Sequence, residues 1–90
     1  MVHIELIPDL SHCVETVARK EFREATRQLL ASGGEDVELQ ERIELLRAFL
    51  KTADFKKLRR ESEKHLLAGN KVRLVLYTRE GTPKYELRLT

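Results

Sequence analysis

The sequence predicts a two-layer α+β sandwich in which three helices pack on one face of a small mixed sheet that ends in a β-hairpin. Three observations predict this fold class: a short alternating segment at the amino end, three amphipathic segments with helical spacing, and two alternating segments at the carboxyl end. The order is therefore β-α-α-α-β-β, and each element has one apolar face to bury. If the helices pack up and down, the first strand runs parallel to the second and antiparallel to the third.

The length of the chain predicts a single domain over residues 1–90. Ninety residues support one hydrophobic core, and a hydrophobic content of 41% is sufficient to build it. A domain of this size has a stability on the order of 5 to 13 kcal/mol at typical per-residue values. Surface buried against a second copy would add to that stability, so we expect a homodimer.

The first strand is predicted over residues 2–6, because apolar and polar residues alternate there until Pro8 ends the run. Either Asp9 or Ser11 can cap the helix that follows. Gly33-Gly34 ends this helix. The apolar face of the helix has members at helical spacing: Leu10, Val14, Val17, Ala18, Phe22, Ala25 and Leu29.

A second helix is predicted to start after Asp36, which is a good N-cap. Phe55 lies about 160° round a continuous helix from Leu39, so a straight helix would move the apolar stripe to its opposite face. A break near Thr52 avoids this, with Thr52 or Asp54 capping a third helix. The stripe of the second helix consists of Leu39, Ile43, Leu45, Leu46, Phe49 and Leu50.

The last third of the chain contains a charged helix and a hairpin. The helix is predicted over residues 54–67, and Gly69-Asn70 stops it. Strands are predicted over residues 71–78 and 83–89, joined by turn residues at 79–83. The helix buries one face formed by Phe55, Leu58, Ser62, His65 and Leu66. The hairpin turns Val72, Leu74, Leu76, Tyr85, Leu87 and Leu89 toward the helices.

The net charge of +2 conceals an asymmetry between the halves of the chain. Residues 1–50 carry six Lys and Arg against ten Asp and Glu, whereas residues 51–90 carry eleven against five. Such a split is typical of an anion-binding half, and equally of two halves that attract each other.

The outer face of the hairpin is a candidate nucleic-acid interface. Cations there can neutralise phosphates, and the ring of Tyr77 offers a stacking surface for a base. The alternative is an ordinary solvated face, or a dimer contact that covers Val75 and Tyr77. Glu86 dilutes the positive charge. The predicted interface residues are Lys71, Arg73, Tyr77, Arg79, Lys84 and Arg88.

Three further groups are weaker candidates. A basic helix face could bind phosphates or an acidic protein partner such as residues 35–44 of a second copy; its residues are Lys56, Lys57, Arg60 and Lys64. Cys13 could be a reactive thiol at a helix start or a small buried residue, and His12 is poorly placed as its base. Glu61 and His65 have the spacing of two metal ligands but lack a third, so we expect a salt bridge there.

The sequence therefore favours a non-catalytic binding or assembly module that works as a cytoplasmic homodimer. The alternative function is binding of single-stranded nucleic acid or RNA. One cysteine excludes an intrachain disulfide, and Gly33-Gly34 lacks the Lys-Ser/Thr of a phosphate loop. We expect no cofactor, no metal and no membrane span, because the longest apolar run covers only residues 74–77.

Overall fold

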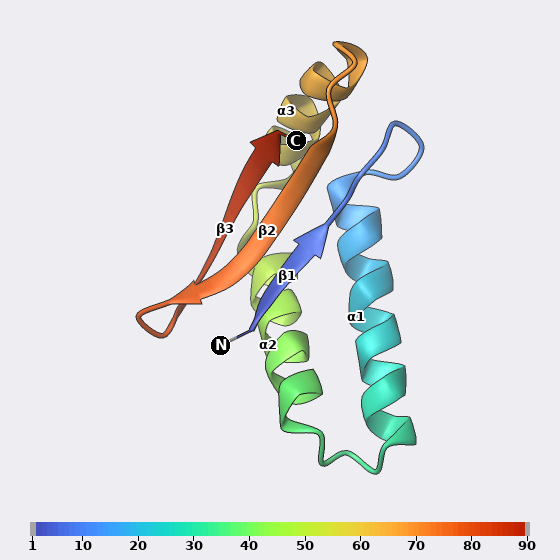
Figure 1. Cartoon of the computed structure of the whole chain (residues 1–90), viewed down its shortest axis with the longest axis vertical. Coiled ribbons are helices and arrows are strands. Elements are labelled where there is room, and N and C mark those ends of the chain that lie inside the picture. The colour runs from blue at the N-terminus through green and yellow to red at the C-terminus, as the bar shows by residue number, and fades with distance from the viewer. Residues whose placement is uncertain (1, 90) are drawn as a thin grey trace.

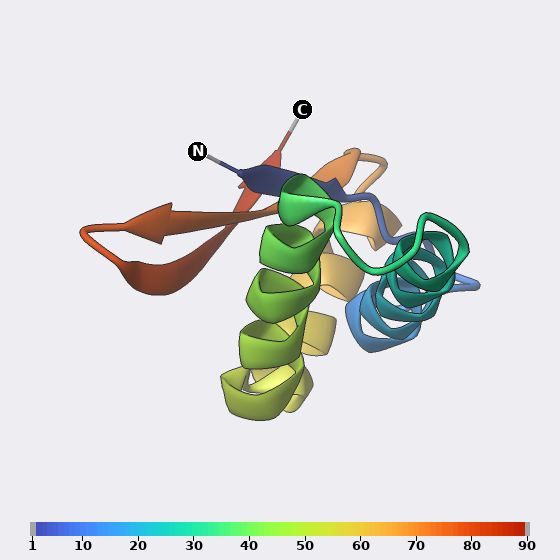
Figure 2. The same cartoon turned by 90° about the horizontal axis from the view of Figure 1, so that it is seen from below.

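The computed structural model describes residues 2–89 and contains the six elements in the predicted order. The elements are β1 (His3–Leu6), α1 (Val14–Ala31), α2 (Val37–Thr52), α3 (Phe55–Leu67), β2 (Val72–Arg79) and β3 (Thr82–Leu89). Figures 1 and 2 show the helices on one side of the three-stranded sheet. The two-layer α+β prediction is confirmed.

The sheet is antiparallel throughout, with the strand order β1-β2-β3. The prediction of a mixed sheet with β1 parallel to β2 is wrong. Only Ala53 and Asp54 separate α2 from α3, and Figure 1 shows that α3 continues toward the same end of the molecule instead of turning back. The chain therefore enters β2 from the far end and runs back along β1.

The core lies between the inner face of the sheet and the helices. Leu74 and Leu76 of β2 are fully buried there, and Ile4 and Leu6 of β1 point to the same side. Phe49 of α2 packs its ring edge to face against Phe55 (5.4 Å between centroids) and Tyr85 (5.1 Å). The predicted stripe of α2 thus faces the core, with Ile43, Leu45, Leu46 and Phe49 buried.

Helix α1 begins later than either predicted cap. The carboxylate of Asp9 accepts hydrogen bonds from the backbone N–H groups of Ser11 (2.8 Å) and His12 (2.7 Å). This is a local turn of the kind that Asp side chains favour, and it holds the chain out of the helix. Cys13 occupies the N-cap position instead, and Leu10, predicted on the apolar helix face, lies exposed in the turn.

The predicted break between α2 and α3 is confirmed. Asp36 accepts a hydrogen bond from the N–H of Leu39, and Asp54 accepts one from the N–H of Lys57, each at 3.1 Å. Thr52 is not the cap, because it is the last residue of α2 and its hydroxyl donates to the carbonyl of Ala48.

The hairpin turn is shorter than the predicted segment 79–83. Only Glu80 and Gly81 connect β2 to β3, and both have positive φ angles, 51° and 77°. Such angles at both central residues define the two-residue turn that matches the twist of hairpin strands. Its tip projects sideways beyond the helices in Figure 2.

Leu76→Ala tests the assignment of β2 as the centre of the core. Leu76 is 0% exposed, so we expect its truncation to lower the free energy of unfolding by about 2–5 kcal/mol through lost burial and a cavity. Leu30, at 74% exposure, is a matched control whose change to Ala shifts stability by at most about 0.5 kcal/mol. Urea denaturation of both variants measures the difference, and equal losses would contradict the assignment.

Candidate functional site

The outer face of the sheet, on the side away from the helices, carries the predicted nucleic-acid interface. Tyr77 lies directly opposite His3 of β1 and Lys84 of β3, so these three side chains form one row across the sheet. The sequence could not place His3, because its neighbour depends on the strand order. Of the predicted residues, Arg73, Tyr77, Arg79, Lys84 and Arg88 belong to the hairpin strands, and Lys71 precedes β2.

Two carboxylates interrupt this surface. Glu5 of β1 accepts a hydrogen bond from Arg73 (Oε1 to Nη1, 3.1 Å), and Glu86 accepts one from Arg88 (Oε1 to Nε, 2.7 Å). Both carboxylates flank Val75, which is 5% exposed although it faces outward. The positive charges of the two arginines are therefore partly neutralised. Glu86 was predicted on this surface, whereas Glu5 was not; its alternation with Ile4 and Leu6 was the available signal.

The remaining cations are spread along the hairpin. Lys71, Arg79 and Lys84 form no ion pair with any group in residues 2–89. Lys71 and Arg79 mark opposite ends of β2, which is roughly 27 Å long at the usual rise per residue. The structure thus brings Tyr77, Lys84 and His3 together, and leaves Lys71 and Arg79 at the two ends.

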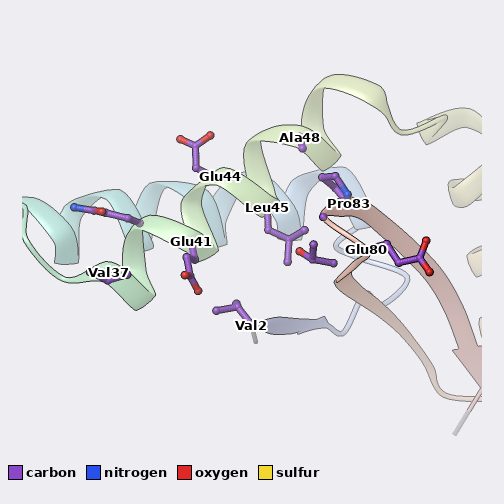
Figure 3. A pocket seen from close by; sticks show the side chains of 11 residues that line it. Val2, Val37, Glu41, Glu44, Leu45, Ala48, Glu80 and Pro83 are labelled. Atoms are coloured by element: carbon purple, nitrogen blue, oxygen red, sulfur yellow. The ribbon is translucent and has the colours of Figure 1, made fainter.

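A cleft of about 970 Å³ lies between α2 and the hairpin tip, on the inner side of the sheet (Figure 3). Val2 and Leu45 are among its apolar lining residues, and Glu41 and Glu80 add negative charge. These carboxylates repel phosphate, so this cleft does not extend the candidate phosphate-binding surface of the outer face. This cleft was not predicted, because its walls come from α2 and from a turn far away in the sequence.

A second groove separates α3 from β3. It has a volume of about 370 Å³, and Leu58, Tyr85 and Leu87 supply its apolar lining. Glu61 and His65 also line it, but they do not form the predicted salt bridge. Within residues 2–89 no three side chains of His, Cys, Asp or Glu gather closely enough to hold a metal ion.

Cys13 is half-buried at the N-cap of α1. Its sulfur lies 3.3 Å from the hydroxyl oxygen of Thr16, and this hydrogen bond, helped by the N–H groups of Thr16 and Glu15 and by the charge of Arg59, lowers the pKa of the thiol. The ring of His12 faces Asp9 at 3.2 Å, so it is not the base for Cys13.

The sulfur borders a pocket of about 270 Å³. Arg59 and Ser62 also line this pocket, and the buried hydroxyl of Ser62 has no hydrogen-bond partner among the described residues. Cys13 is therefore a partly accessible thiol beside a small polar pocket, and not the fully buried apolar residue that was the other reading of the sequence.

The basic face of α3 is exposed along its length. Its four residues, Lys56, Lys57, Arg60 and Lys64, form no ion pair with any group in residues 2–89. Beside them, Arg59 binds Glu63, which lies four residues further along the helix, at 2.9 Å. No helix in residues 2–89 is long and apolar enough to cross a membrane.

Comparison with known proteins gives two matches in sequence. A protein-family model matches residues 2–87, nearly the whole chain. A protein of Archaeoglobus fulgidus described as uncharacterized is 47% identical over 51 residues, which cover 54% of this chain and 60% of that relative. No solved structure matches the chain.

Replacing Thr16 tests the chemistry of Cys13. In Thr16→Ala the thiolate loses its hydrogen bond, so we expect the pKa of Cys13 to rise toward that of a free thiol. The pH dependence of the alkylation rate measures this pKa. Thr26→Ala is the control, because the hydroxyl of Thr26 on the same helix donates to the carbonyl of Phe22. An unchanged profile in Thr16→Ala, or a Cys13 that does not react at neutral pH, would contradict the assignment.

Proposed function

The chain belongs to the protein family whose model matches residues 2–87. We propose that it is a non-catalytic binding or assembly module that works as a homodimer in the cytoplasm. The observation that carries the proposal is the exposed edge of β3. Every residue of this eight-residue strand is exposed or half-buried, and the apolar side chains of Tyr85 and Leu89 are 38% and 50% exposed.

An open edge strand of this kind can pair with a partner. Its unpaired N–H and C=O groups invite pairing with another chain, and proteins usually shorten, charge or cover such edges. In β3 the apolar side chains on the inner face add a second reason for association, because burial removes them from water. A second copy is the simplest partner, since one contact then covers the β3 edge of each copy.

The charges of the helices also favour association between copies. Exposed Glu38, Glu41 and Glu44 make one side of α2 acidic, whereas four exposed cations form the basic face of α3, with Glu61 and Glu63 at its borders. Opposite patches of this kind speed encounter between copies, and their effect falls with ionic strength.

Size-exclusion chromatography with light scattering tests the homodimer. We expect a mass of about twice the 10.5 kDa of one chain at micromolar concentration. Repeating the measurement at two salt concentrations separates the electrostatic contribution, because apolar burial persists where charge attraction is screened. A monomeric mass at every concentration would contradict the homodimer.

Binding of single-stranded nucleic acid is the second candidate function. The row His3, Tyr77 and Lys84 favours it, because an aromatic ring between a histidine and a lysine can stack on a base while the lysine meets a phosphate. This face would remain free in a dimer formed through the edge of β3. The nearby Glu5 and Glu86 oppose it.

Anisotropy of a labelled single-stranded oligonucleotide tests this second function. We expect an affinity that falls steeply with salt, and a loss of about 1–3 kcal/mol in Tyr77→Ala from the missing stacking. Lys84→Ala should weaken binding, whereas Lys20→Ala, an exposed lysine on α1 outside both basic surfaces, serves as the matched control. Failure of the protein to bind mixed oligonucleotides at low salt would eliminate this function.

A further inference from the structure

We propose that two copies join through β3 in one defined antiparallel register, in which Leu87 lies opposite Leu87 of the second copy. This inference rests on the proposed homodimer and names its interface. The result is a continuous six-stranded sheet with both helix layers on the same side.

The edge of β3 is accessible. One side of the strand is paired with β2 from Thr82 to Leu89, and no described residue pairs with the other side. Figure 1 shows β3 at the outer margin of the sheet, with α3 behind its upper end. Pro83 has no N–H to give to a ladder, which limits a new pairing to the residues after it. The available stretch is therefore 84–89.

Symmetry restricts the register. A two-fold axis perpendicular to the sheet keeps the two helix layers together, and it must pass beside one central residue of β3. Residues directly opposite each other in an antiparallel pair point to the same face. Tyr85, Leu87 and Leu89 then meet one another on the inner face, and Lys84, Glu86 and Arg88 meet on the outer face.

Charge excludes three of the possible centres in residues 84–89. A register centred on Lys84 places two ammonium groups against each other. A register centred on Glu86 places this carboxylate against itself and Lys84 against Arg88 of the second copy. A register centred on Arg88 places two guanidinium groups against each other. Like charges directly opposite each other on a sheet are destabilising.

The remaining centres are Tyr85, Leu87 and Leu89. Leu89 is the last residue of β3, so a register centred there pairs only the end of the strand. The other two centres differ in their inner pairs. Centred on Tyr85, the pairing sets Leu87 against Pro83, which lacks an N–H, and Leu89 against Gly81, which lacks a side chain. Centred on Leu87, it sets Tyr85 against Leu89 and Leu87 against Leu87, so every inner contact is apolar.

The register centred on Leu87 also places opposite charges against each other on the outer face. Glu86 of each copy lies opposite Arg88 of the other, which gives two attractive pairs. Within one copy Arg88 lies directly opposite Arg73, an unfavourable neighbour, so a carboxylate on its other side compensates. On the inner side, Leu89 and Tyr85 of the second copy lie at the mouth of the groove between α3 and β3.

Cysteine cross-linking tests this register. In a Cys13→Ser background, Leu87→Cys places two thiols directly opposite each other, where the Cβ atoms of antiparallel neighbours are about 4.5–5.5 Å apart, close to disulfide range. We expect a covalent dimer on a non-reducing gel after mild oxidation with diamide. Tyr85→Cys and Leu30→Cys are the controls and should remain uncross-linked, since Tyr85 faces Leu89 and Leu30 lies on α1.

The outcomes separate the two proposals. Cross-linking at Tyr85→Cys and not at Leu87→Cys would overturn the register. No cross-link at either position, in a protein that light scattering shows to be dimeric, would overturn the β3 interface and leave the homodimer standing. A monomeric mass for the unmodified chain would overturn both.

Charge reversal provides an independent test that does not depend on cysteine chemistry. Glu86→Arg and Arg88→Glu should each raise the dissociation constant of the dimer about tenfold, because two attractive pairs become repulsive. The double variant E86R/R88E restores both pairs and should return the constant toward that of the wild type. Circular dichroism checks that each variant folds, and equal dissociation constants in all four proteins would overturn the register.

Discussion

The pairing of β2 on both of its sides is the constraint on which the rest of the structure depends. Its inner residues Leu74 and Leu76 are fully buried, and β1 and β3 align to it residue by residue. Because β2 fills the centre, β1 and β3 become the two edges. The helices cover β1 more completely than β3, and this difference determines which edge is open to a partner.

The helix layer covers the two edges unequally. Ile4 and Leu6 of β1 are buried, whereas Tyr85, in the same row as Ile4, is 38% exposed and Leu89, at the end of β3, is 50% exposed. In the helix layer α1 and α2 form one antiparallel pair, and the hairpin tip extends away from them (Figure 2). An uncovered edge with an apolar inner side is the feature from which we infer self-association.

The sequence was sufficient for features that depend on neighbouring residues. The position of Phe55 relative to Leu39 predicted the break before α3. Asp36 was recognised as a cap, and Asp54 as one of two candidates beside Thr52, because the capping bond spans only three residues. The alternation in the hairpin predicted which side of β2 is buried. The start of α1 was misjudged because Asp9 could cap a helix or close a turn, and local chemistry allows both.

Features that depend on distant segments could not be obtained in this way. The direction of β1 relative to β2 follows from the path of α3, and the pairing of Glu5 with Arg73 follows from the strand order. The candidate basic surface was therefore predicted in its residues but not in its charge balance. The exposure of β3 likewise reflects how far the helix layer reaches, which no periodicity encodes.

Amide hydrogen exchange resolved by residue, at high and low protein concentration, tests both the central position of β2 and the open edge of β3. We expect β2 to exchange most slowly throughout, because it is paired on both sides. In residues 84–89 of β3, all amides should be protected at high concentration, and on dilution only the alternate amides directed at β2 should remain so. A protection pattern in β3 that does not depend on concentration in a dimeric protein, or a β2 that exchanges faster than β3, would contradict these expectations.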